Sequence, residues 1–483
     1  MSLETIFWSA LLLPLLGAIC SGSVSKSSLG GIFAIVSSWG CLTLLTCVLV
    51  PFLQGTEPLL SLSNWILCTK LSAAFLLLTA LVMALALTQS HIFFQNEFKE
   101  GKLPDQKHIC WYYAFSLLFL ISMMSVFVSE NLGTLWIGIE ATSLLSAGLV
   151  YFSRTKHAIE ATWKYLIICS VGIAFALLGT IFIFASSQYG AIEGGSLCFA
   201  TLEARAAMLQ PLLLKLGFIF CLVGYGTKSG VFPLHSWLPD AHSEAPAPAS
   251  AMLSASLLNC ALFAIFKVVS ITNLSTCGPS CYMACLWAGV ITVLAASLFL
   301  IKQHGLKRLW AYSSIENVGL MMVAIGLGSA PLFFLQALNH SIVKVSLFCT
   351  AGNIIQICGT KELSHIQGLL KISPLNAVLL LLGGLAVTGT PPFGTFISEW
   401  MLLAVSLENH HAIVAVLIIV SLTIAFVAIV YHIGRMLIGS GQIVKLEKIN
   451  MTSIKYSAIP ALLILISVVL CFVVRPEILG VLK

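Results

Sequence analysis

Ionisable side chains lie at a few positions inside long apolar runs of this sequence. Three are carboxylates: Glu140 in LWIGIEATSLLS, Glu316 in AYSSIENVGLMM and Glu399 in TFISEWMLL. Two are lysines, Lys228 and Lys344, which lie too deep in their runs to reach an interface with water. A charged group inside hydrocarbon costs free energy and is a functional candidate by default. These residues indicate that an ion is moved through a membrane.

A histidine adds to this set. His340 lies four residues before Lys344, so the two side chains share one face of a helix. The histidine could also be a hydrogen-bonded residue of the protein core. Burial disfavours the charged form of a lysine, whereas a nearby carboxylate favours it. Moving the carboxylate would therefore switch a buried lysine between holding and releasing a proton, which favours the proton as the ion.

Four other lysines lie within or at the margins of apolar runs: Lys70, Lys164, Lys215 and Lys267. The first three lie near the ends of their runs, where a long side chain can extend to the interface. Two interpretations stay open for Lys267. It extends to the interface, or it belongs to an exit path for the ion.

The stretch 224–249, GYGTKSGVFPLHSWLPDAHSEAPAPA, breaks the helical pattern around Lys228. Its glycines loosen the helix, and Pro233 removes a backbone donor. In hydrocarbon, irregular backbone is tolerated only where protein or a water-filled cavity surrounds it. We expect a second half-helix over His235–His242, and both of these histidines are further candidates for the ion path.

A second stretch has the same punctuation. Gly389-Thr390 is followed by two prolines and Gly394, and a half-helix is expected over Phe396–Val405. The two broken runs, 211–242 and 375–407, are five spans apart, and an odd number inverts the direction through the membrane. Broken helices in matching places of two inverted halves are typical of transporters. We therefore predict two inverted five-helix repeats, spans four to eight and nine to thirteen.

The composition is that of a membrane protein. Of 483 residues, 59% are hydrophobic and 9% are charged, and the mean hydropathy is +1.02. No soluble domain has this balance. A window of about 19 residues predicts an all-α polytopic fold of about fourteen transmembrane helices with short loops. We divide the chain into N-terminal helices (1–108), a first repeat (109–270), a second repeat (281–437) and a C-terminal loop with the last span (438–483).

The loops predict an orientation. Arg205, Arg475 and Lys483 fall on one side of the predicted membrane. The other side has many more basic residues: Lys26, Lys99, Lys102, Lys107, Arg154, Lys156, Lys302, Lys307, Arg308, Lys361, Lys371, Arg435, Lys445, Lys448 and Lys455. By the positive-inside rule both termini face outward. The loop after the first break, with Asp240, His242 and Glu244, then lies near the inner face.

Cysteines and basic residues give no sign of a cofactor or of nucleic acid. None of the 15 cysteines forms a CxxC pair, which argues against an iron–sulfur or zinc site. Cys277, Cys281 and Cys285 cluster near a predicted outer loop. Helix packing is the simple interpretation of this cluster, and a disulfide or metal site is the alternative. The chain has no nucleotide or flavin motif, so we expect no cofactor in it.

The segment LHSWLPDAHSEAPAPASAMLSA (234–255) strongly resembles the signature of the antiporter-like, proton-translocating subunits of respiratory complex I. The same family includes the large subunits of Mrp-type sodium/proton antiporters and the membrane arms of group 4 hydrogenases and formate hydrogenlyase. The resemblance covers nearly the whole chain. SEAPAPASAMLSASLLNCALFAI together with YSSIENVGL looks closest to component F of hydrogenase-4.

The resemblance implies roles for single residues. Glu140 and Lys228 match the charge pair of the family, and His340 with Lys344 matches its central relay. Glu399 lies where relatives have a terminal lysine or glutamate. One departure is Asn259, because many relatives have a lysine or histidine there. A water-bridged relay could replace that residue, or Lys267 two turns along could serve.

Three hypotheses follow. The first is a proton-translocating subunit in a bacterial inner membrane, driven by redox chemistry in partner subunits of a hydrogenase-4, formate hydrogenlyase or NADH:quinone oxidoreductase type of complex. Protons would pass along Glu140, Lys228, His340/Lys344 and Glu399. The second is an Mrp-type Na⁺/H⁺ antiporter subunit or a proton-coupled inorganic carbon uptake subunit. The third is a structural membrane subunit whose path is interrupted at Asn259.

Overall fold

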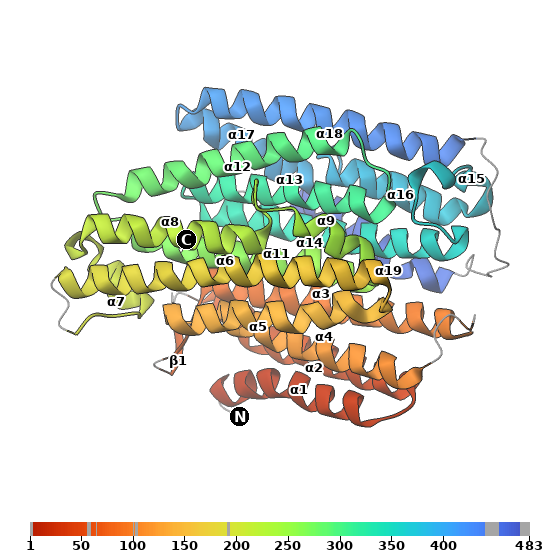
Figure 1. Ribbon diagram of the computed structural model, residues 1–483, viewed down its shortest axis with the longest axis horizontal. Coiled ribbons are helices and arrows are strands. Elements are labelled where there is room, and N and C mark those ends of the chain that lie inside the picture. Colours follow the sequence, from red (N-terminus) through yellow and green to blue (C-terminus); the bar gives the residue numbers. More distant parts are fainter. Residues whose placement is uncertain are drawn as a thin grey trace.

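The computed structural model describes residues 3–55, 59–63, 65–99, 101, 105–190, 194–439 and 454–473. Long helices that run roughly side by side make up nearly all of these residues (Figure 1). Twelve of the described helices are long and apolar enough to cross a membrane. A helix satisfies its own backbone hydrogen bonds, so it can cross hydrocarbon where open strands cannot. The prediction of an all-α polytopic membrane protein is confirmed.

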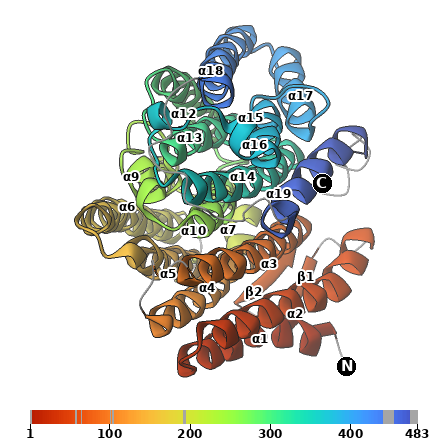
Figure 2. The same cartoon turned by 90° about the vertical axis from the view of Figure 1, so that its right-hand side faces the viewer.

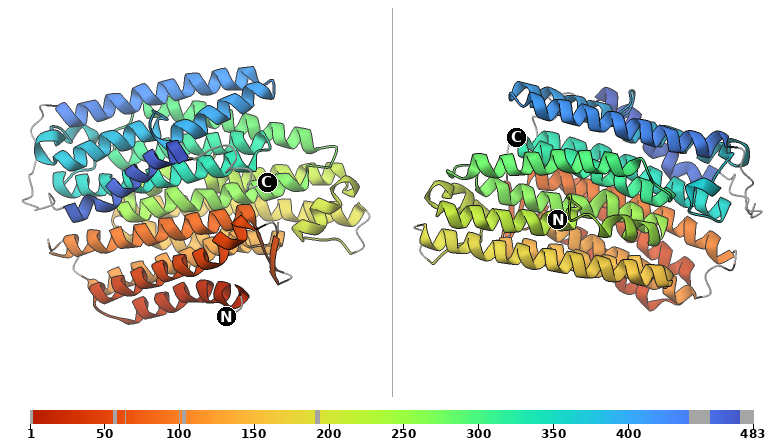
Figure 3. Two further views of the ribbon diagram at one scale, coloured as in Figure 1. Left: turned by 180° about the vertical axis from the view of Figure 1, so that it is seen from behind. Right: turned by 45° about the horizontal axis from the view of Figure 1, so that its top comes forward.

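The N-terminal part packs on one edge of the molecule. It consists of α1 (Leu3–Ser23), α2 (Ser27–Gln54), the antiparallel hairpin β1 (Leu59–Ser63) and β2 (Ile66–Thr69), and α3 (Lys70–Lys99). The hairpin pairs position 59 with position 69 and position 60 with position 68. The view from behind and the view with the top tilted forward agree that α1 and α2 (red) lie at one edge and α18 (blue) at the opposite edge (Figure 3).

The next part corresponds to the first predicted repeat. It consists of α4 (Gln106–Phe127), α5 (Leu132–Val150), η1 (Tyr151–Ser153), α6 (Lys156–Tyr189), α7 (Phe199–Ala204), η2 (Ala206–Met208), α8 (Pro211–Ser229), α9 (Trp237–Glu244), α10 (Ala247–Met252), the π-helical turn η3 (Leu253–Leu257) and α11 (Leu258–Ile271).

The last part corresponds to the second predicted repeat and the last span. It consists of α12 (Gly278–Leu300), α13 (Leu306–Gly326), α14 (Ala330–Cys358), η4 (Leu363–His365), α15 (Leu369–Ile372), α16 (Pro374–Val387), α17 (Gly394–Glu408), α18 (Ala412–Ile438) and α19 (Ile454–Val473).

Two differences explain why twelve of the described helices are long and apolar enough to cross a membrane, although about fourteen spans were predicted. Helix α13 has 21 residues, enough to cross, but its polar residues make it less apolar than the twelve. The predicted run 375–407 is divided into α16 and α17, with 14 and 15 residues, and neither is long enough to cross alone. Both differences arise where the buried polar and charged residues are concentrated.

Helix α14 lies at the centre of the bundle, surrounded by α10, α13, α16 and α19 when the molecule is seen end-on (Figure 2). It and the continuous segment α10–η3–α11 are buried almost throughout. Peripheral helices such as α6 and α18 instead expose apolar side chains along one side, which suits contact with lipid. The polar residues of the core are therefore presented by the most enclosed helices.

Both predicted helix breaks are present. Helix α8 ends at Ser229 and is capped by Gly230, which has a left-handed φ of 82°, and α9 begins at Trp237. The indole of Trp237 donates to the carbonyl of Thr227 at 2.8 Å and so ties the two halves together. His235 precedes α9, so the half-helix predicted over 235–242 begins two residues later than expected. The second break has left-handed Gly389 (φ 64°), and α17 begins at Gly394.

The halves repeat one packing order. Helices α8 and α9 both pack on α6, and α16 and α17 both pack on α14. The boundaries of the inverted repeats stay a prediction. So does the orientation, and five of the basic residues used for it lie outside the described residues: Lys102, Lys445, Lys448, Arg475 and Lys483.

Candidate functional site

Lys228 lies in the last turn of α8, just before the first break, and is fully buried. Its Nζ donates to the hydroxyl of Ser143 on α5 at 2.7 Å and to the phenol of Tyr165 on α6 at 2.6 Å. The phenol also shares a hydrogen bond of 2.6 Å with the hydroxyl of Ser146. Three helices therefore fix the position of this ammonium group.

Glu140 lies one turn before Ser143 on α5. It is half-buried, and its Oε2 atom has no hydrogen-bonding partner among the described residues. The carboxylate interacts electrostatically with Lys228. No ion pair within 4.0 Å joins them in the described part of the chain, and Lys228 binds the two hydroxyls instead. We call Glu140, Ser143, Tyr165 and Lys228 the first lysine centre.

Lys344 on α14 is held in the same way by α13. Its Nζ donates to the carbonyl of Trp310 at 3.0 Å and to the hydroxyl of Ser313 at 2.8 Å. One turn along α13 lies Glu316, which is buried, interacts electrostatically with Lys344 and has an Oε2 atom with no partner within the described ranges. We call Ser313, Glu316, His340 and Lys344 the second lysine centre.

The two lysine centres share a design. In each, a buried lysine binds a serine, and a carboxylate lies three residues from that serine on the same helix, Glu140 with Ser143 and Glu316 with Ser313. A spacing of three places both side chains on one face of a helix. The lysine therefore has a neutral partner that it contacts and an acidic partner that it does not.

His340 is fully buried one turn before Lys344. Its Nε2 donates to the carbonyl of Ser254, in the π-helical turn η3, at 3.2 Å. A neutral imidazole that donates through Nε2 accepts through Nδ1. That Nδ1 has no partner among the residues described. The histidine can therefore accept a proton on the side that no protein group occupies.

Asn259 on α11 lies between the lysine centres. Its Nδ2 donates to the carbonyl of Ala255 at 2.9 Å and to the hydroxyl of Ser341 at 3.0 Å, next to His340 on α14. The adjacent Cys260 interacts electrostatically with Lys228. Asn259 is fully buried, and its Oδ1 has no partner in the described ranges. An amide does not titrate, but it can hold water at this point.

Glu399 lies in the first half of α17, against the second break. It is buried, and a Cβ added to Gly389 would lie 1.8 Å from its Oε2. Asn339 on α14 donates to the carbonyl of Gly394 at 2.9 Å, which fixes the start of α17. Glu399 also interacts electrostatically with Glu316, so it extends the second lysine centre toward α17.

The other candidates divide into one neighbour of the second lysine centre and two outlying residues. His242 is buried, stacks on Phe348 with ring centres 5.2 Å apart and interacts electrostatically with Lys344. His235 instead packs against Phe299 of α12, with ring centres 5.6 Å apart. The ammonium of Lys267 lies 4.3 Å from the ring centre of Phe199. The last two therefore contact neither lysine centre.

Sequence reasoning missed the groups that bind the lysines. Ser143 and Ser313 could have been found, because each is three residues from a buried glutamate. Tyr165 lies on a different helix from both Glu140 and Lys228, so only the fold reveals it. The cysteines near the outer loop, Cys277, Cys281 and Cys285, are buried free thiols, and no metal-binding group of three or more His, Cys, Asp or Glu occurs among the described residues.

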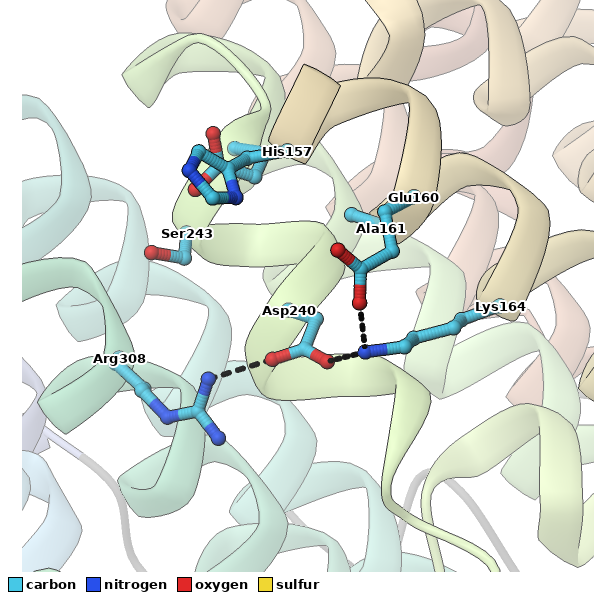
Figure 4. Close-up of a pocket in the computed structure, with 8 residues that line it drawn as sticks. His157, Glu160, Ala161, Lys164, Asp240, Ser243 and Arg308 are labelled. Carbon is cyan, nitrogen blue, oxygen red and sulfur yellow. Dashed lines mark hydrogen bonds and ion pairs between the residues drawn. The ribbon is translucent and has the colours of Figure 1, made fainter. Parts of the chain in front are cut away.

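A surface pocket of about 180 Å³ lies at the end of the bundle that contains α9. Asp240 is at its centre, 2.5 Å from Arg308 of α13 and 3.4 Å from Lys164 of α6 (Figure 4). Lys164 also pairs with Glu160 at 2.6 Å. These ion pairs join α9, the second half of the broken span, to its neighbours on both sides.

Comparison with known proteins shows the family of the chain. Residues 129–427 match the family described as NADH:quinone oxidoreductase/Mrp antiporter, TM. The hydrogenase-4 component F homolog of Methylacidiphilum infernorum (isolate V4) is 34% identical over 419 residues, which cover 85% of each chain. NADH-quinone oxidoreductase subunit N of Desulforudis audaxviator (strain MP104C) is 30% identical over 341 residues, 69% of this chain and 66% of the relative.

A solved structure shares the fold. A chain of the membrane-bound sulfane sulfur reductase (MBS), an archaeal respiratory membrane complex, superimposes with a TM-score of 0.85 at 22% identity, covering 99% of this chain and 96% of that one. The family match spans both helix breaks and both lysine centres. The chain therefore belongs to the transmembrane family of the NADH:quinone oxidoreductases and Mrp antiporters.

Proposed function

We propose that this protein is the proton-translocating membrane subunit of a redox-driven complex of the hydrogenase-4 or NADH:quinone oxidoreductase type. The observation that carries the proposal is the pair of lysine centres, each with a fully buried lysine that binds a serine hydroxyl and with a carboxylate on the same helix as that serine. The similarity to the hydrogenase-4 component F homolog supports the type of complex.

The first lysine centre is suited to a proton switch. With Lys228 on Ser143 and Tyr165, the carboxylate of Glu140 is offset from it. A shift that brings Glu140 into contact would favour the charged lysine, and its withdrawal would favour release of the proton. Neutral hydroxyl groups still hold the amine after that release, because the phenol and the serine hydroxyl can each donate as well as accept.

Water would connect the centres. Buried polar atoms nearly always have a hydrogen-bonding partner, either protein or ordered water. Six of the buried atoms that lack a protein partner in the described chain lie on elements from α5 to α17, and we propose that water bound to them forms the path: Glu140 Oε2, Ser256 Oγ, Asn259 Oδ1, His340 Nδ1, Glu316 Oε2 and Glu399 Oε1. Asn259 then takes part as a water-binding residue of the path.

The remaining parts of the mechanism lie partly in other chains. Proton uptake would be at the inner face near α9, and release would be near Glu399 and α17. This chain would hold no cofactor, so the driving energy would come from redox chemistry in partner membrane and peripheral subunits. Coupling requires that those partners move α5 and α8 relative to each other. This movement would change the distance between Glu140 and Lys228, which determines whether the lysine holds or releases its proton.

The test is proton flux by the complex reconstituted in liposomes, with variants in this subunit. Lys228→Ala and Glu140→Ala should each abolish proton pumping while the complex still assembles. Lys371→Gln, an exposed lysine of α15, is the matched control and should pump normally. Sodium flux measured in the same liposomes separates a proton pump from a Na⁺/H⁺ antiporter. Full pumping in both alanine variants would refute the proposal.

A further inference from the structure

A second pocket opens beside the turn that joins α12 to α13, with a volume of about 540 Å³. One wall is apolar and consists of Leu298, Phe299 and Ile301, all exposed at the surface of the bundle. The other wall is basic and consists of Lys302, His304 and Arg308. In a membrane protein, exposed apolar side chains face acyl chains, and flanking cations lie at the level of the headgroups. The pocket therefore lies at the membrane interface.

The basic wall has hydrogen-bonding capacity that the protein does not use. The exposed Lys302 and His304 have no side-chain hydrogen bond or ion pair within the described residues. Arg308 binds Asp240 through Nη1 only, and its other terminal nitrogen points away from that carboxylate (Figure 4). No side chain caps the N-terminus of α13 at Gly305, so the positive end of the helix adds to the potential there.

We propose that this pocket binds an anionic phospholipid. Its phosphate would lie between Lys302 and Arg308, and an acyl chain would lie along Leu298 and Ile301. Arginine and lysine are the usual ligands of phosphate groups, and basic pockets between helices bind anionic headgroups at the membrane surface. An acidic protein surface would match the cations but would leave the exposed apolar wall without a partner. A lipid satisfies both walls at once.

The site is linked to the broken span through Arg308, which lines both this pocket and the one around Asp240. A phosphate on the free terminal nitrogen of Arg308 shares the guanidinium group with Asp240, and the two negative charges repel each other. Asp240 lies on α9, the second half of the broken span. The lipid would therefore loosen one of the two ion pairs of Asp240, and removing the Asp240 charge should strengthen lipid binding.

The experiment is native mass spectrometry of the full-length chain in detergent, titrated with phosphatidylglycerol or phosphatidylcholine of the same acyl composition. The wild type should bind phosphatidylglycerol more tightly. Lys302→Gln should weaken this binding about fivefold, the effect of one cation near an anionic headgroup, and leave phosphatidylcholine unaffected. Asp240→Asn should tighten it. Lys371→Gln removes an exposed lysine at the same end of the molecule and should change nothing.

Three results would overturn the inference. The first is equal binding of the two lipids by the wild-type chain, which would leave the pocket to a partner protein. The second is unchanged phosphatidylglycerol binding by Lys302→Gln. The third is an equal loss in Lys302→Gln and Lys371→Gln, because that would show diffuse attraction to a basic surface. None of these readouts depends on proton pumping, so the inference is tested independently of the proposed function.

Discussion

The close contact between Gly389 and Glu399 makes the second break sensitive to a single methyl group. A Cβ at Gly389 would lie 1.8 Å from Oε2 and 2.5 Å from Cδ of Glu399. In the Gly389→Ala variant, the carboxylate of Glu399 must therefore move by roughly 1.5 Å to regain ordinary contact. The left-handed φ of 64° at this position adds about 1–2 kcal/mol for a residue with a Cβ.

Two effects are expected from Gly389→Ala. The free energy of unfolding falls by about 1–3 kcal/mol through backbone strain and repacking. Proton flux falls further, because a displacement of about 1 Å at a reacting group can cost on the order of a hundredfold in rate. The assays are proton flux in liposomes and thermal unfolding of the same preparation.

Gly226→Ala is the control for an added methyl group beside a helix break, because Gly226 lies in the last turn of α8, just before the first break. A Cβ there would meet nothing closer than Val231 at 3.7 Å. This variant should pump near the wild-type rate. Normal flux in Gly389→Ala, or equal damage in the two variants, would refute the assignment of Glu399 to the path.

Three further changes test the other parts of the site. Tyr165→Phe removes one of the two hydroxyl groups that hold Lys228. Because a hydrogen bond to a charged group contributes about 1.5–3 kcal/mol, proton flux should fall at least tenfold. Flux at the wild-type rate would contradict this prediction. His340→Gln can still donate to a carbonyl but cannot titrate, so the complex should assemble while flux falls about a hundredfold, and unimpaired pumping would exclude the histidine as a relay. Asn259→Leu removes the water-binding amide, so proton flux should be lost. The free energy of unfolding should fall by about 1–3 kcal/mol, which an unfolding measurement checks. Retained flux would show that the path avoids this residue.

The fold was largely predictable because the apolar composition of each run determines a membrane-spanning helix, and glycine and proline residues determine where a helix is broken. Both breaks were placed correctly by Gly230 and by Gly389, each of which adopts the left-handed conformation that favours glycine. The count of spans was harder to predict. Helix α13 is polar enough to resemble a non-spanning helix, yet it is fully enclosed by its neighbours. The window of about 19 residues still counted this helix among the fourteen spans, and its burial by protein explains how so polar a helix is tolerated inside the bundle.

The charged residues of the candidate site could be chosen from the sequence because their burial costs free energy. The neutral residues that hydrogen-bond to them could not. Lys228 and Lys344 were chosen because a lysine deep in hydrocarbon is so unfavourable that it rarely occurs without a function; both are fully buried, and their role in the path stays a prediction. Tyr165, the partner of Lys228, was not chosen, since an aromatic residue in an apolar run has no distinctive signal. Lys267 and His235 were candidates by position alone, and tertiary packing places each against a phenylalanine instead.

The π-helical turn Leu253–Leu257 sets the rotational phase of the helix that separates the two lysine centres. A π turn contains one residue more than an α turn, and one residue corresponds to about 100° of rotation. Ser254, inside the turn, offers its carbonyl to His340, and Asn259, just beyond it, reaches Ser341 on the same helix. Deleting Ser256, whose hydroxyl has no partner among the described residues, would restore α-helical geometry and swing one of these two contacts away from α14. The extra residue thus acts as a rotational spacer that lets two consecutive turns face the same neighbour.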